Sequence, residues 1–235
     1  MAILQPAIER KLSSLLGAKV TFEKFIVSPL SGTIEATGVR VGEPADPLLT
    51  IVLVRAQVSI KQAFKGEIVV KSIIIEKPVV SFSPEKLPRR ATASDAPDKD
   101  DKTSWKFDVQ KLFIIDGQVT ARLSSFELST GRVLLDLNRV EQDYSLTFLA
   151  EDVRRTDRAA MIGTIGTIGA TGRIMNVADL TKFADASASG EVTLGELGRI
   201  SYATPRIRSM QGEIELHGKI TLAQIATLLL PPRRP

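Results

Sequence analysis

The sequence predicts a mainly β protein with an antiparallel, meandering sheet and a few short helices. The clearest sign is strict alternation over residues 52 to 60, where every second residue is apolar: Val52, Val54, Ala56, Val58 and Ile60. Arg55 and Gln57 fall between them, so the segment has the pattern of a strand with one dry and one wet face. Composition agrees, because 43% of the residues are hydrophobic and only 5% are aromatic, which leaves burial to aliphatic side chains suited to a pleated sheet.

A helix is expected before the first strand. Residues 2 to 16 place Ile8 and Leu12 on one helical face, and Gly17 supplies a stop. Beyond it the period changes to two, and a hairpin turn is expected at residues 129 to 132. The segments with strand character are 20–27, 32–41, 50–60, 66–76, 78–83, 105–116, 118–129, 132–140, 144–150, 158–174, 189–197 and 211–220.

Less regular segments divide the chain. Residues 84 to 104 hold three prolines and many charges but almost no large apolar side chains, which predicts a mobile loop. Short helices are expected at residues 177–186 and 221–230. The predicted organisation is therefore a helix and first β segment at 1–83, the charged loop, and a continuation of the β structure at 105–235.

Composition excludes several classes of site. The chain has no cysteine, which rules out disulfides, thiolate catalysis and cysteine-ligated metals. His217 is the single histidine, so histidine-based triads and multi-histidine metal sites are hard to build. The 31 basic residues interleave with 27 acids, unlike the basic stripe of a nucleic-acid binder. We therefore expect no cofactor, no metal and no nucleic-acid partner.

Three local features have plain interpretations. Glycines recur at every third position in residues 163 to 172, but the Lys-Ser/Thr pair of a phosphate loop is missing, which favours a Gly-rich strand. Glu213 and Glu215 share a strand face about 7 Å apart; with Lys219 nearby they indicate a solvated face, the rival hypothesis being a carboxylate-based hydrolase. Trp105 is interpreted as an anchor for a strand start. We predict that the chain is not an enzyme.

One apolar run occurs twice. The segment IIIEKPVVSF has a counterpart 40 residues on, FIIDGQVTAR, in which Ile114 and Ile115 fall at the same offsets as Ile74 and Ile75. Over residues 68 to 75 both faces of the expected strand carry large apolar groups. A sheet lined in this way must be covered by another sheet, by helices or by something that is not protein.

The order of parts carries a family resemblance. An amphipathic helix precedes LLGAKVTFEKFIVSPLSGTIEATGVRVG, and KQAFKGEIVVKSIIIEKPVVSF, the charged loop and WKFDVQKLFIIDGQVTARL follow. Over most of residues 2 to 150 this order resembles the N-terminal portion of the bacterial AsmA-like family (AsmA/TamB-type envelope proteins). The resemblance implies a long, twisted antiparallel sheet that curls into a groove with an apolar interior. It also implies a periplasmic, inner-membrane-anchored protein for phospholipid transport or outer-membrane homeostasis between the two membranes.

On this interpretation acyl chains lie on the apolar face and head groups stay at the wet rim. The expected lining is Val52, Val54, Val58, Ile60, Ile73, Ile75, Val80, Phe82, Phe113 and Ile115. An error of one residue in register would move a strand's side chains to the other face. The alternative is that the protein's own helices cover the face, which would make the chain a structural scaffold or protein-interaction module that supports outer-membrane protein assembly with envelope protein partners.

Membrane attachment is expected through an anchor outside this chain. No run reaches about 18 apolar residues, and the first residues lack the basic and long apolar regions of a signal peptide. A sheet of about a dozen strands spaced about 4.8 Å apart extends about 55 to 60 Å. That length can hold an acyl chain, but we expect it to be too short to bridge the periplasm alone.

Overall fold

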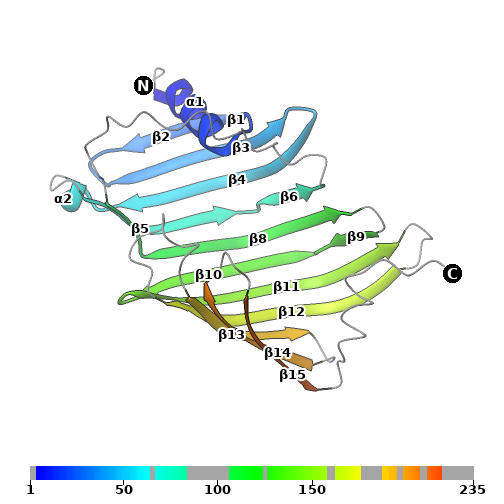
Figure 1. The fold of residues 1–235 in the computed structure, drawn as a ribbon. Helices are drawn as coiled ribbons and strands as arrows, with labels where there is room; N and C mark the ends of the chain where they lie inside the picture. The colour runs from blue at the N-terminus through cyan, green and yellow to red at the C-terminus, as the bar shows by residue number, and fades with distance from the viewer. Residues whose placement is uncertain are drawn as a thin grey trace. The chain divides into compact units, whose positions relative to one another are not determined.

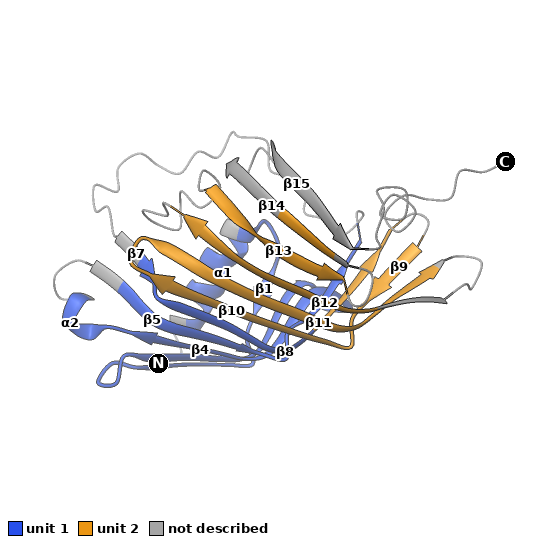
Figure 2. Cartoon of the chain, turned by 90° about the horizontal axis from the view of Figure 1, so that it is seen from below, with its two compact units in different colours: residues 1–117 blue, residues 118–235 orange. Residues whose placement is uncertain are grey.

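The computed structural model describes residues 4–63, 67–83, 106–123, 126–157, 162–175, 187–194, 198–206 and 211–218. The chain divides into two compact units, Met1–Gly117 (unit 1) and Gln118–Pro235 (unit 2), which Figure 2 colours separately. The prediction of a mainly β protein is confirmed, because the described strands belong to a large mixed sheet (Figure 1). The expected charged loop, Trp105 and the two late helices lie outside the described residues.

Unit 1 begins with a helix and continues with strands that pair side by side. Its elements are α1 (Leu4–Leu16), β1 (Val20–Thr21), β2 (Lys24–Ser28), β3 (Thr33–Glu43), β4 (Asp46–Val58), α2 (Ile60–Ala63), β5 (Glu67–Glu76), β6 (Val79–Phe82), β7 (Lys106–Val109) and the first part of β8 (Lys111–Arg122). Hydrogen-bonded neighbours follow the order β1-β3-β4-β5-β8, with β2 beside β3, β6 beside β4 and β7 beside β5.

Strand direction in unit 1 differs from the expectation at one strand. The ladders from β1 to β5 are antiparallel as predicted, but β5 runs parallel to both β7 and β8. A parallel neighbour requires a long connection between the two strands. Residues 77 to 110 supply that length, so the chain returns to the same end of the sheet before β8 begins.

Unit 2 is an antiparallel meander after a short irregular start. Its elements are the end of β8, β9 (Phe126–Ser129), β10 (Arg132–Val140), β11 (Asp143–Asp157), β12 (Ile162–Met175), β13 (Ser187–Leu194), β14 (Gly198–Arg206) and β15 (Gln211–Gly218). From β10 to β15 each strand pairs with the next in the chain.

Two details of unit 2 were not predicted. The prediction of a hairpin turn at residues 129 to 132 is wrong, because β9 pairs with β11 and with the end of β8 rather than with β10. The sequence also gave no sign of β14, whose residues include Gly198 and Pro205. Both residue types are depleted in strands, so the local pattern there is weak although the ladder forms.

Helix α1 lies at the β1 edge of unit 1 (Figure 1), and its side chains cap backbone groups there. The Phe22 N–H donates to Glu9 Oε1 at 2.9 Å, and Gln5 Nε2 donates to the Phe22 carbonyl at 2.9 Å. The Val20 N–H donates to Ser13 Oγ at 2.8 Å. An uncovered edge strand presents unpaired N–H and C=O groups to other chains. The helix therefore satisfies backbone groups that no neighbouring strand reaches.

Each unit has its own apolar cluster. The buried residues of unit 1 are Val20, Ala36, Val39, Val41 and Ile51, and Leu12 of α1 packs against them. The buried residues of the unit 2 cluster are Val133, Ala150 and Val153. These clusters stabilise the units, and they leave other apolar side chains of the sheet outside them.

The helix cap is tested by replacing Glu9 with alanine. Because the Phe22 N–H then loses its acceptor, we expect the free energy of local opening at this edge to fall by about 1–3 kcal/mol. Hydrogen exchange at the Phe22 amide measures it. Replacement of Lys11, an exposed residue of the same helix, is the control and should change protection by less than about 0.5 kcal/mol. Unchanged exchange in the Glu9→Ala variant would show that the cap is not needed.

Candidate functional site

The registers of unit 1 bring apolar side chains together in rows across the strands. Direct partners in a ladder project from the same face, and consecutive rows alternate between faces. Two rows, spaced two residues apart along each strand, contain only apolar residues. They are Phe25, Ala36, Val54, Ile75 and Ile114 in the first row, and Val27, Ile34, Ala56, Ile73 and Leu112 in the second. We call these ten residues the unit 1 apolar face.

The rows that alternate directly with these two are polar or mixed, whereas further along β3 and β4 the pairs Val39–Ile51 and Val41–Leu49 belong to the apolar cluster that Leu12 packs against. The row between the two apolar ones is Ile26, Glu35, Arg55, Ile74 and Phe113. Within it, Arg55 Nε donates to Glu35 Oε1 at 2.7 Å. The next row toward the end of the sheet holds Ser28, Thr33, Gln57 and Ser72, with the Thr33 hydroxyl 3.1 Å from Gln57 Oε1. The two faces therefore differ in chemistry along the same strands.

The unit 1 apolar face is only partly covered. Ala36 is buried, and the other nine residues are half-buried. Val54 and Ile75 of the first row pack against the buried cluster of unit 1, and Leu12 of α1 packs against the same cluster. The residues of the second row lie outside that cluster.

Unit 2 repeats the same separation of faces. Its apolar rows are Val133, Ala150, Ile168 and Leu194; Leu135, Phe148, Ala170, Val192 and Ile200; and Leu137, Leu146, Gly172 and Gly190. We call these residues the unit 2 apolar face. A row on the opposite face holds Asp136, Thr147, Thr171, Glu191 and Ser201. The side chains of the row through Phe148 are all half-buried, and the part of unit 2 that the structure describes contains no helix.

A β-bulge in β11 lengthens the unit 2 apolar face. The register with β12 shifts between Ala150 and Val153, and Asp152 has a φ of 52°. Ala150 and Val153 are both buried in one cluster, although their spacing of three positions would put them on opposite faces of a regular strand. Two residues further, Arg155 is only 8% exposed, and its Cζ lies 4.4 Å from the centroid of the Phe126 ring. The bulge thus keeps apolar side chains on one face beyond the point where regular alternation would reverse them.

Five of the ten predicted lining residues divide between the two faces of the unit 1 sheet. Val54, Ile73 and Ile75 lie on the unit 1 apolar face, as expected. Phe113 and Ile115 lie on the other face, because their partners in the parallel ladder are Ile74 and Glu76. The expectation that all these side chains share one face is therefore wrong. The sequence repeat has an offset of 40 residues, but the ladder pairs residues 39 apart, and a slip of one residue reverses the face.

The remaining predicted residues are scattered. Ile60 begins α2 and does not continue the strand, and Val52 is 57% exposed. Val58 is half-buried and follows a register shift at the end of β4. Val80 pairs with Leu49 across β6 and β4, and Phe82 is half-buried at the end of β6. These positions adjoin the unit 1 apolar face without forming one continuous row with it.

Sequence reasoning missed the unit 2 apolar face. All of its residues except Ile200 of β14 lie in predicted strands, and the alternation of Leu135 and Leu137, or of Leu146 and Phe148, is visible in the sequence. What the sequence does not contain is the register that aligns these pairs across several strands.

The structure places two other candidate features of the sequence in strands. The Gly-rich segment at residues 163 to 172 lies within strand β12, so the prediction of a Gly-rich strand is confirmed. Glu213, Glu215 and His217 lie in β15, which pairs with β14. Within the described residues, no three His, Cys, Asp or Glu side chains gather as metal ligands do. The same residues include no helix with the length and hydropathy needed to cross a bilayer.

Comparison with family models, with curated proteins and with solved structures finds no match to this chain. The functional proposal therefore draws on the geometry of the two apolar faces and on the order of parts in the sequence.

The register of the parallel ladder is tested with paired cysteines, which this cysteine-free chain allows without background. Cysteines at Ile74 and Phe113 are direct partners, at a spacing that permits a disulfide. We expect the Ile74→Cys/Phe113→Cys variant to oxidise readily, as measured by intact mass. The control, Ile74→Cys/Ile114→Cys, places the two side chains on opposite faces and should stay reduced. Oxidation of the control in place of the first pair would support an offset of 40.

Proposed function

We propose that this chain is a non-enzymatic AsmA-like envelope protein that binds or conducts phospholipid acyl chains on the apolar faces of its sheet. The observation that carries the proposal is the alternation, in both units, of all-apolar rows with polar or mixed rows across several paired strands. Half-buried aliphatic rows with no described helix over unit 2 offer a surface for hydrocarbon. The polar rows leave the opposite face to water.

The dimensions of a row suit one acyl chain. Five strands at about 4.8 Å span about 19 Å, whereas the tails of one bilayer leaflet occupy about 15 Å of the hydrocarbon core. Each methylene that leaves water contributes about 0.8 kcal/mol. A lining of Val, Ile, Leu and Ala provides this non-directional contact without any single essential residue, and no catalytic group is required.

The cellular role follows from the resemblance in the order of parts. An AsmA-like protein would work in the periplasm at the inner membrane, in lipid transport or outer-membrane homeostasis between the two membranes. Envelope proteins are its expected protein partners.

A scaffold function is the second candidate. It is favoured by α1, whose Leu12 already packs against part of the unit 1 cluster and so covers apolar surface with protein. In that case the chain would support outer-membrane protein assembly through protein contacts, and it would carry no bound lipid.

Aspartates on the apolar faces test lipid binding. We expect Val54→Asp/Ile75→Asp to remove lipid from unit 1 and Phe148→Asp to remove it from unit 2, because a buried carboxylate opposes hydrocarbon contact. The variant that combines all three should carry no lipid after purification, as measured by mass spectrometry of extracted lipid. Circular dichroism shows whether each variant folds.

The controls use neighbouring residues on the opposite faces. Ile115→Asp and Thr147→Asp place the same charge on exposed positions and should keep the lipid content of the parent chain. Lipid retained in the folded triple variant would contradict binding on the apolar faces, and an absence of lipid from the parent chain would favour the scaffold.

A further inference from the structure

The turn between β2 and β3 presents a fully exposed leucine on fixed backbone. Leu30 is 100% exposed. The Gly32 N–H donates to the Ser28 carbonyl at 2.9 Å, and Ser31 Oγ lies 3.0 Å from Thr33 Oγ1. These hydrogen bonds hold the turn in one conformation, so Leu30 projects into solvent from an ordered support.

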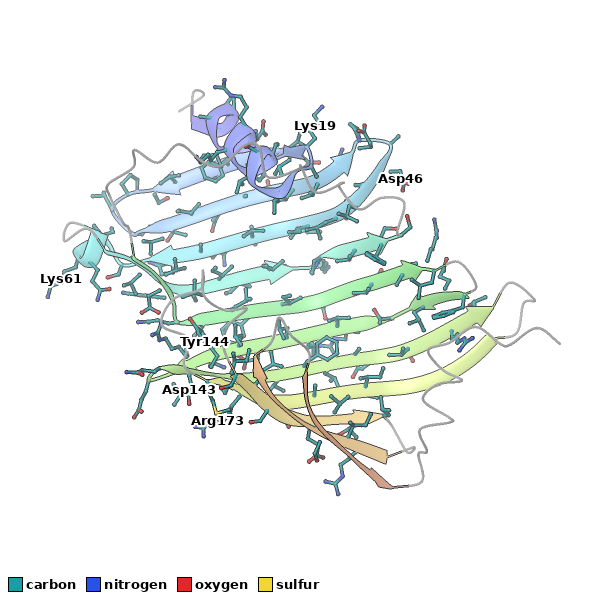
Figure 3. All side chains as sticks on the ribbon, in the orientation of Figure 1. Lys19, Asp46, Lys61, Asp143, Tyr144 and Arg173 are labelled. Carbon is teal, nitrogen blue, oxygen red and sulfur yellow. The ribbon has the colours of Figure 1, made fainter. Side chains whose placement is uncertain are left out.

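The turn lies against α2 at one end of unit 1. The Val58 N–H donates to the Gly32 carbonyl at 2.8 Å. Gly32 has a φ of 68°, and a Cβ there would lie 2.3 Å from the Val58 carbonyl oxygen and 3.1 Å from Ile60 Cγ1. Only glycine fits this close approach. The contact places Lys61, an exposed residue of α2 that projects outward in Figure 3, at the same end as Leu30.

More cations gather at this end. Strands β5 and β8 pass this end of the sheet (Figure 1), and each carries an exposed lysine there: Lys71, between the residues of β5 that pair with the end of β4, and Lys111, the first residue of β8. Strands β5 and β7 also place two acids, Glu67 and Asp108, and one further base, Lys106, at this end. With Lys61, four basic residues therefore stand against two acids in α2, β5, β7 and β8 at this end.

We propose that this end of unit 1 docks on an anionic lipid bilayer. Leu30 would enter the boundary between head groups and acyl chains, and Lys61, Lys71 and Lys111 would face the phosphates. An apolar tip flanked by cations binds an anionic membrane surface through burial and charge together. A protein partner fits less well, because one projecting leucine offers little apolar area for a stable interface.

Docking goes beyond the proposed function and does not depend on it. It needs the turn and the lysines but not the apolar faces. The second row of the unit 1 apolar face, which includes Val27 and Ile34, lies next to the row of Ser28 and Thr33 at this end. A docked chain would therefore hold that row near the bilayer surface.

Vesicle binding of the full chain tests the proposal. The parent chain should co-sediment with phosphatidylcholine vesicles that contain phosphatidylglycerol, and much less with phosphatidylcholine alone. We expect Leu30→Asp to weaken this binding about tenfold or more, because the tip loses its buried side chain. Lys61→Gln should weaken it about fivefold at low salt and less at high salt.

A matched control separates a local effect from a general one. Val140 is 47% exposed near the turn that joins β10 to β11 in unit 2, and Val140→Asp should bind vesicles like the parent chain. Because the chain has no cysteine, Leu30→Cys and Val140→Cys can each carry an environment-sensitive dye. The dye at position 30 should shift to the blue on anionic vesicles, and the dye at 140 should not.

Three outcomes would overturn docking: no vesicle binding by the parent chain, unchanged binding by Leu30→Asp, or equal losses in the Leu30 and Val140 variants. Any of them could occur while the chain still carries lipid after purification, and lipid could be absent while docking holds. The two proposals are therefore distinguished by these measurements.

Discussion

The register between neighbouring strands is the constraint on which the rest of this structure depends. Side chains alternate along a strand, so the register decides which residues of adjacent strands share a face. In unit 1 it aligns Val54 with Ile75 and Ile114, and in unit 2 it aligns Phe148 with Ala170 and Val192. Each alignment collects aliphatic groups on one face and leaves polar residues on the other.

Irregular features preserve this separation of faces. The bulge in β11 lets Val153 join the cluster of Ala150, where unbroken alternation would have turned it away. The helix α1 contributes differently, since Glu9 and Ser13 bind backbone groups at the β1 edge. An edge capped by side chains is less open to pairing with other chains, which matters for a sheet that keeps apolar groups half-exposed.

Much of the fold could be predicted from local patterns, whereas the pairing of strands could not. Alternation located most strands, and β10 was placed at residues 132 to 140 as observed. The parallel direction of β5 and β8 depends on how residues 77 to 110 return, which no local pattern specifies.

The candidate lining shows the same limit. The expected lining put Ile75 and Ile115 on one face, but the ladder pairs Ile75 with Ile114, so Ile115 lies on the other face. Ile60 was assigned to a strand by its period, and α2 begins there instead. Both errors arise because alternation is a property of one strand, whereas a face is a property of several.

The central claim is that the apolar faces contact acyl chains. A phospholipid with a photoreactive diazirine in its acyl chain tests this directly, with labelled residues located by mass spectrometry of peptides. We predict labelling at Phe148 and Val192, which share an apolar row, and not at Thr147 and Glu191 on the opposite face. Labelling that favours the polar row, or an equal yield on both faces, would contradict the claim.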